Sequence, residues 1–132
     1  MKATELMIDD LVIHGFGGIG KITEIDNKTV VIKDDGFDLG DGMNEVSFAL
    51  NELKPIPVTA ETLEKNGFYY ENNVGHVLEH YDYEIIYNMW GHELRILENR
   101  KQILNLEYFD KMCVHELQHA LRLCGINKEI EI

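Results

Sequence analysis

The sequence is short of several residue types that mark whole classes of protein. Its 132 residues include two cysteines, two prolines and one tryptophan, and 24 acidic residues against 12 basic ones give a net charge of −12. No apolar run approaches the ~20 residues that cross a bilayer as a helix, and the first ten residues lack the apolar region of a signal peptide. We therefore expect a cytoplasmic chain with no membrane segment.

The scarcity of basic residues also limits the partners of the chain. So acidic a surface repels phosphate backbones, which disfavours nucleic acid as a partner and leaves a protein as the expected one. The two cysteines, Cys113 and Cys124, fall in one predicted helix, about 16 Å apart at 1.5 Å per residue. That separation is too long for a disulfide, so we expect both to stay thiols. Composition does not indicate the oligomeric state.

The first 53 residues show the pattern of short strands joined by turns. Apolar and β-branched residues alternate with polar ones over 11–14, 21–26, 29–33 and 45–50, with a glycine-rich turn at 15–20. Strands of this length predict a small SH3-like β-barrel or strongly bent sheet. Pro55 and Pro57 then favour an extended connector.

The remainder of the chain, 54–132, predicts an antiparallel sheet with two helices. A short helix is expected between an N-cap at Thr59 and a C-terminal Gly67. Aromatic and β-branched residues alternate with charges over 68–106, which is typical of antiparallel strands. A last helix is expected from a cap at Asp110 to Gly125, and 129–132 as an edge strand. The fold class is thus α+β, with units 1–53 and 54–132 either separate or packed as one domain.

The last predicted helix contains H-E-L-Q-H, which matches the zinc-binding H-E-x-x-H of metallopeptidases. In that chemistry His115 and His119 hold the metal and Glu116 activates water. A zinc-dependent hydrolase is therefore the alternative function, with zinc as its cofactor. No downstream residue is spaced as a third ligand. The helical wheel also places both imidazoles opposite the apolar stripe, beside Lys111 and Arg122, so a solvated helix face is the preferred interpretation.

Three further motifs are weaker. The string "HVLEH" carries His76 and His80 in a predicted strand, where residues four apart lie about 13 Å apart. A structural metal shared by His76, His80 or His92 with the final helix is an open alternative that the spacing does not demand. "GFGGIG" precedes a hairpin rather than a helix, which favours a turn over a nucleotide site. The acidic loop 34–45 has EF-hand length, with Asp34, Asp38 and Glu45 at ligand positions, but lacks the required glycine.

Three stretches carry a resemblance to a known family: "MKATELMIDDLVI" at the start, "LKPIPVTAETLEKNGF" at the joint and "VHELQHALRLCGINKEIEI" at the end. The chain resembles a family of small uncharacterised proteins from Bacteroides and related gut bacteria that are often associated with phages or mobile elements. The resemblance implies no catalytic residues. We therefore expect a non-enzymatic binding module with a protein partner, and no catalytic, cofactor or metal residues outside the zinc alternative.

Overall fold

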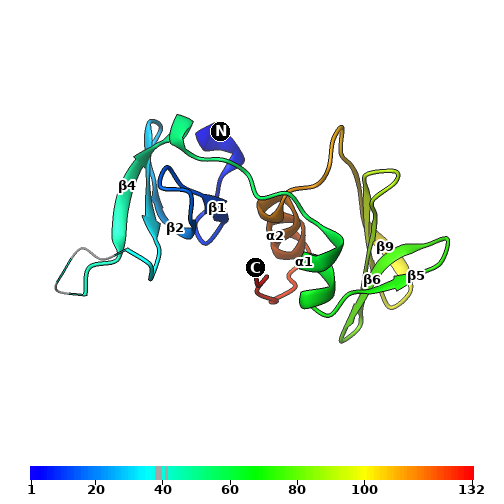
Figure 1. Cartoon of the computed structure of the whole chain (residues 1–132). Coiled ribbons are helices and arrows are strands. Elements are labelled where there is room, and N and C mark those ends of the chain that lie inside the picture. The colour runs from blue at the N-terminus through cyan, green and yellow to red at the C-terminus, as the bar shows by residue number, and fades with distance from the viewer. Residues whose placement is uncertain (38–39, 41) are drawn as a thin grey trace. The chain divides into compact units, whose positions relative to one another are not determined.

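The computed structural model describes residues 1–37, 40 and 42–132, which divide into two compact units. Unit 1 comprises Met1–Ile56 together with Cys113–His119, and unit 2 comprises Pro57–Met112 together with Ala120–Ile132. Each unit holds one antiparallel sheet, and the chain has two α-helices in its described part (Figure 1). The fold class is α+β, as predicted.

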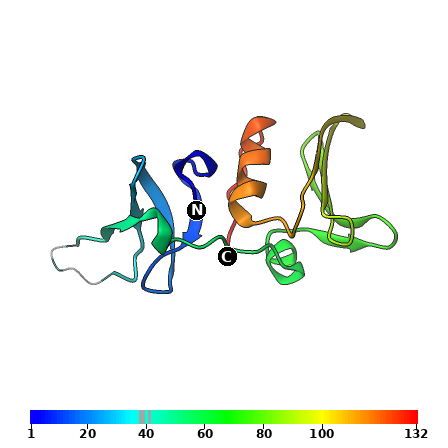
Figure 2. The same cartoon turned by 90° about the horizontal axis from the view of Figure 1, so that it is seen from above.

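Unit 1 is built on a four-stranded antiparallel meander in which each strand pairs with the next along the chain (Figure 2). Its strands are β1 (Leu11–Ile13), β2 (Ile19–Ile25), β3 (Thr29–Lys33) and β4 (Glu45–Ala49), and its 3-10 turns are η1 (Ala3–Glu5) and η2 (Leu50–Glu52). The sheet order shows an open sheet rather than a closed barrel among the described residues. After η2 the chain returns to β1, where the backbones of Ile13 and Lys54 exchange two hydrogen bonds of 2.9 Å.

The core of unit 1 follows from the alternation within these strands. Val30 and Ile32 on β3 are at most 1% exposed while Val31 between them is half-buried, because successive strand residues point to opposite faces. Each such aliphatic side chain stabilises the fold by roughly 1.5–3 kcal/mol when removed from water. The buried cluster consists of Leu6, Val12, Ile22, Val30, Ile32, Phe48 and Leu53.

Unit 2 opens with the helix α1 (Ala60–Lys65), whose ends are those predicted. The Thr59 side chain accepts a hydrogen bond from the Thr62 N–H, which caps the helix. At the other end Gly67 has a φ of 91°, and its N–H and that of Phe68 close a Schellman motif on Glu64 and Leu63.

The sheet of unit 2 is a five-stranded antiparallel meander, also in sequence order (Figure 1). It comprises β5 (Tyr69–Glu71), β6 (Gly75–His80), β7 (Tyr83–Asn88), β8 (Glu93–Glu98) and β9 (Lys101–Glu107). Among its buried side chains is Tyr87, 1% exposed, whose hydroxyl accepts a hydrogen bond from the Met112 N–H at 3.1 Å. The chain beyond the sheet is thereby fastened to β7.

The second helix, α2 (Val114–Leu123), begins later than predicted. Asp110 does not cap it, because residues 112–114 are engaged elsewhere: the Met112 N–H bonds Tyr87, and the Val114 N–H donates to the Ile56 carbonyl at 2.8 Å. The end of the helix is as predicted, with Gly125 at a φ of 72° in a second Schellman motif. The helix is divided between the two units after His119.

The prediction of a final edge strand over 129–132 is wrong, since no strand is present there. The buried side-chain amide of Asn66 bonds the backbone of this segment instead. It accepts from the Glu131 N–H at 2.7 Å and donates to the Glu131 carbonyl at 2.7 Å. Across the described residues, no helix has the length and apolar character needed to span a bilayer.

Candidate functional sites

The glutamate of the H-E-L-Q-H string acts as a helix cap. Glu116 is the third residue of α2, and its Oε1 accepts a hydrogen bond of 2.9 Å from the N–H of Cys113, the residue before the helix. This is the glutamate half of a capping box, which satisfies an N–H that has no partner inside the helix. The carboxylate that a hydrolase would use on water is thus held by its own backbone.

The two residues that follow Leu117 tie α2 to the start of the chain. The Gln118 amide bridges two backbone groups, since it accepts from the Leu11 N–H at 3.0 Å and donates to the Asp9 carbonyl at 3.2 Å. The ring of His119 lies beside them, with its Nε2 2.7 Å from Oδ2 of Asp10. Three hydrogen bonds therefore join residues 9–11 to one face of the helix.

Asp10 is the centre of this connection. It is 0% exposed, and its Oδ2 accepts from the Met7 N–H at 2.8 Å as well as from His119. A buried carboxylate requires such partners, because an unpaired charge away from water costs several kcal/mol. Through these bonds Asp10 connects the start of the chain to α2 within unit 1.

The prediction that the imidazoles of this helix face water is wrong for His115, which is 6% exposed. Its ring contacts that of His119 edge to face, with a distance of 5.6 Å between the ring centroids. The helical wheel missed this burial because it contains no other part of the chain, and Lys111, which it placed beside the imidazoles, lies before the helix. Burial lowers the pKa of His115 against the opposing pull of the Asp10 and Glu116 carboxylates, which favours the neutral form of the ring.

A pocket of about 470 Å³ lies at this face of unit 1. It is lined by Met1, Glu5, Pro55, Cys113, His115, Glu116 and His119.

These residues fit the zinc alternative poorly. The Nε2 of His119 is occupied by Asp10, Glu116 is a cap, and the Nδ1 of His115 is buried without a hydrogen-bond partner. Over the part of the chain that the structure describes, no three His, Cys, Asp or Glu side chains gather as a metal site would require. Zinc binding at His115 and His119 remains a prediction for metal analysis.

The other histidines named by the sequence do not meet. His76 and His80 stand at the two ends of the strand β6, which confirms the predicted strand, and His92 lies in the turn before β8. His76 is buried, with its Nε2 3.8 Å from Oε1 of Glu64, whereas His80 contacts the ring of Tyr81. Each imidazole thus has separate surroundings.

The glycine-rich stretch is the turn between β1 and β2, as predicted. His14 is 4% exposed; its Nε2 lies 2.7 Å from Oδ2 of Asp34, and its Nδ1 accepts from the Phe16 N–H at 3.2 Å. Gly18 makes this pair possible, since a Cβ there would lie 2.9 Å from the His14 Nε2. The bond from His14, helped by the Gly36 N–H, lowers the pKa of Asp34.

The same contacts bear on the acidic loop. Asp34 is directed to His14 and the Gly36 N–H, and Glu45 opens β4, so neither is presented as an EF-hand ligand would be. Asp38 lies outside the described residues.

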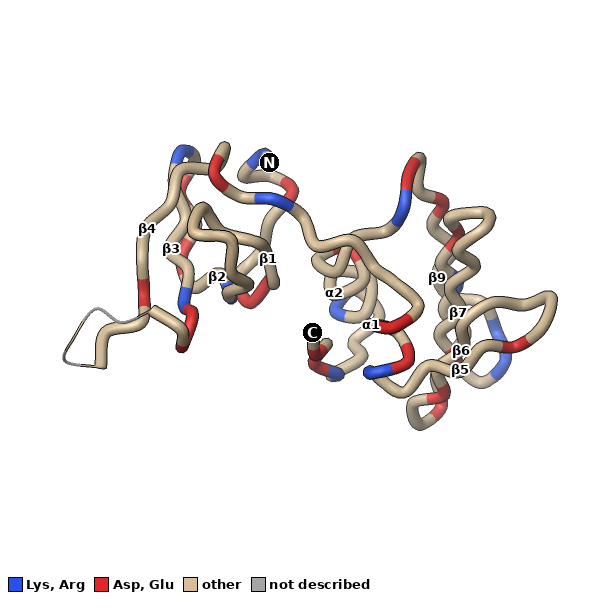
Figure 3. Tube along the Cα trace, viewed as in Figure 1, with Lys and Arg blue, Asp and Glu red and all other residues tan. Residues whose placement is uncertain are grey.

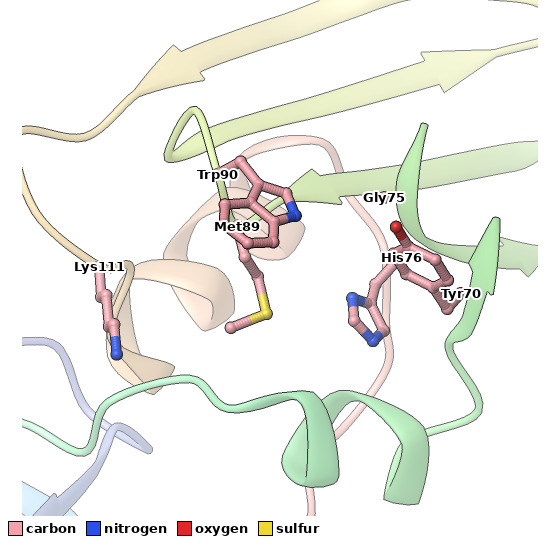
Figure 4. A pocket seen from close by; sticks show the side chains of 6 residues that line it. All are labelled: Tyr70, Gly75, His76, Met89, Trp90 and Lys111. Atoms are coloured by element: carbon pink, nitrogen blue, oxygen red, sulfur yellow. The ribbon is translucent and has the colours of Figure 1, made fainter. Parts of the chain in front are cut away.

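Unit 2 holds a second pocket, about 440 Å³ in volume and mostly apolar (Figure 4). Tyr70 and His76 line one side and Met89 and Trp90 the other, with Lys111 farther along (Figure 4). Trp90 is 90% exposed and Tyr70 56% exposed. The sequence shows the aromatic strings of this region but does not predict the pocket, because the aromatic and histidine side chains that line it come from β5, from β6 and from the turn after β7.

The backbone beside this pocket is closely packed. Gly75 has a φ of 125°, and a Cβ there would lie 2.5 Å from the Tyr87 carbonyl oxygen, so only glycine fits. A smaller pocket of about 180 Å³ shares Tyr70, Gly75 and Trp90 with the first, and Asn88 accepts from the Trp90 N–H at 3.0 Å. Trp90 is therefore exposed at a turn whose backbone is fixed.

No family model, curated protein or solved structure matches the chain.

Proposed function

We propose that the protein is a non-enzymatic binding module whose aromatic pocket in unit 2 receives an apolar side chain of a protein partner. The observation that carries this proposal is the exposure of Trp90 and Tyr70 at the edge of an apolar pocket of about 440 Å³. Tryptophan, tyrosine and methionine are enriched where protein interfaces concentrate their binding energy. A monomer gains little stability from a side chain that remains in water.

The form of the pocket favours a protein over a small molecule as the ligand. Small-molecule sites bury most of their ligand, whereas here the two largest walls are themselves exposed. The net charge of −12 favours a basic partner, and one carboxylate lies beside the pocket lining, since Oε1 of Glu64 is 3.8 Å from Nε2 of His76. Acidic residues are spread over both units in Figure 3.

Two finer proposals accompany this one. Unit 1 is SH3-like in the order of its elements, a reading supported by the return of the chain after η2 to bridge Ile13 with Lys54. The second follows from the resemblance to phage- and mobile-element-associated Bacteroides proteins: we propose that the partner lies inside the bacterial host cell, in keeping with the cytoplasmic location expected from the sequence.

A displayed library of random peptides, selected on the folded protein, tests the main proposal. Selected peptides should share an apolar residue and should shift the emission of Trp90, which is the single tryptophan and reports on this pocket alone. Trp90→Ala should weaken their binding at least thirtyfold, the effect of a hot-spot residue.

Tyr81→Asn is the matched control. Tyr81 is 93% exposed at the far end of β6, and its φ of 55° suits asparagine. The variant should bind the selected peptides as the wild type does. Equal binding by Trp90→Ala would refute the proposal. If metal analysis found one zinc per chain, lost in His119→Ala, the hydrolase alternative with His115, Glu116 and His119 would replace it.

A further inference from the structure

A second exposed aromatic side chain stands on unit 1, independently of the pocket in unit 2. Phe16 lies in the turn between β1 and β2 and is 72% exposed. Its ring contacts three others edge to face: His14 and Phe37 at centroid distances of 5.9 Å and Phe48 at 5.2 Å. The ring is therefore supported from below while most of its surface remains in water.

The turn that presents Phe16 is held by polar contacts. The Phe16 N–H donates to Nδ1 of His14, while the His14 N–H donates to the Gly18 carbonyl at 2.9 Å. The other ring nitrogen of His14 is fixed by Asp34. An exposed aromatic whose backbone and ring are both fixed loses little conformational entropy on binding, which is the property of a preorganised recognition residue.

Carboxylates lie around this aromatic surface. The Oε1 of Glu52 accepts from the Ala49 N–H at 3.0 Å, and its Oε2 is 2.8 Å from the point where a Cβ on Gly15, the neighbour of Phe16, would lie. The carboxylate of Asp34 bonds the His14 ring that supports Phe16, and Asp35 is the next residue in the sequence. Unit 1 as a whole carries twelve acidic and five basic residues. An aromatic face with carboxylates beside it is complementary to a cation, and to a guanidinium above all, because arginine stacks on rings and pairs with carboxylates.

We propose that Phe16, with Glu52 beside it, is a docking surface for an arginine side chain of a basic protein segment. The guanidinium stacks on the exposed face of Phe16 and pairs with Glu52, while His14, Phe37 and Phe48 hold the ring in place. This surface is separate from the Trp90 pocket, and the two proposals can fail independently.

Fluorescence anisotropy with labelled tetra-arginine and tetra-lysine peptides of equal charge tests the docking surface. The wild type should bind tetra-arginine more tightly than tetra-lysine at low salt. Phe16→Ala should weaken tetra-arginine binding about fivefold, the size of an exposed cation–π interaction, and remove the preference for arginine. Phe16→Tyr should keep both. Glu52→Gln should weaken tetra-arginine binding by about twofold to fivefold.

Phe109→Ala is the control, because Phe109 is fully exposed on unit 2 and its loss leaves every charge in place. It should bind tetra-arginine as the wild type does, as should Trp90→Ala. Equal binding by Phe16→Ala and the wild type would show attraction by net charge alone and would overturn the proposal. So would an equal loss in Phe109→Ala, or no binding of tetra-arginine by the wild type.

Discussion

In unit 1 the polar side chains of α2 are bonded inward, to residues 9–11 and to the backbone before the helix, whereas in unit 2 two large aromatic side chains stand exposed beside an apolar pocket. The first arrangement uses groups capable of chemistry to hold the fold. The second leaves groups that would stabilise a core in contact with water. A motif therefore indicates function only when the fold leaves its functional atoms available: the Trp90 side chain is exposed, whereas Glu116 uses one carboxylate oxygen to cap its own helix.

The largest expected effect on stability comes from removing the Asp10 carboxylate, which bonds His119 and the Met7 N–H in unit 1. Asp10→Ala should lower the free energy of unfolding by about 3 kcal/mol, since it leaves His119 and the Met7 N–H without their acceptor. Urea unfolding followed by circular dichroism measures the loss. Asp9→Asn is the control: Asp9 is exposed with a φ of 72°, and the change should cost less than about 0.5 kcal/mol. Similar losses for Asp10→Ala and Asp9→Asn would show that the bonds of the Asp10 carboxylate contribute nothing specific to stability.

A smaller effect should appear in the pH dependence of stability. Burial lowers the pKa of His115 in the folded protein below its usual 6.5, so the unfolded chain takes up the proton first as the pH falls. The contribution is fully present above about pH 6.5 and is lost as the pH falls to the folded pKa. His115→Leu should remove this part of the slope, at most about 1.4 kcal/mol per pH unit, from unfolding curves between pH 5 and 8. If His115→Leu kept the wild-type slope, some other group would carry the pH dependence.

The smallest effect on stability should come from the exposed aromatic side chains of unit 2. Trp90→Ala should change the free energy of unfolding by less than about 0.5 kcal/mol, because the side chain is already in water. Tyr87→Phe, which removes one buried oxygen, should cost about 1–2 kcal/mol by leaving the Met112 N–H without its acceptor. Thermal unfolding of both variants checks the order, and a larger loss from Trp90→Ala would mean that the indole is structural.

Local chemistry explains which parts of the fold the sequence could predict. Thr59, Gly67 and Gly125 lie at helix ends as expected, because caps are decided by residues a few positions apart. The strands of the described residues fall largely within the predicted alternating segments for the same reason, although β2 begins two residues early, at Ile19, and β9 ends one residue late, at Glu107. The start of α2 was missed because Ile56 and Tyr87, distant in the sequence, bind residues 112–114.

The candidate sites were harder to predict from the sequence, because they too depend on contacts between residues that are distant along the chain. Gln118 and His119 bond residues about a hundred positions earlier, and a helical wheel contains no information about such contacts. The sequence did identify His115, Glu116 and His119 as a group, and they line one pocket. It could not identify the Trp90 pocket, since Tyr70, His76 and Trp90 belong to separate elements and no spacing rule connects them.

The bonds between Gln118 and residues 9–11 also set an order of events during synthesis. The ribosome releases the first strand long before it makes α2, so the Leu11 N–H and the Asp10 carboxylate must wait about a hundred residues for their partners. At 5–20 residues per second that wait lasts roughly 5–20 seconds. Unit 1 is therefore complete only after Cys113–His119 have been synthesised, and a nascent chain stalled before residue 113 lacks the amide and the imidazole that bond residues 9–11.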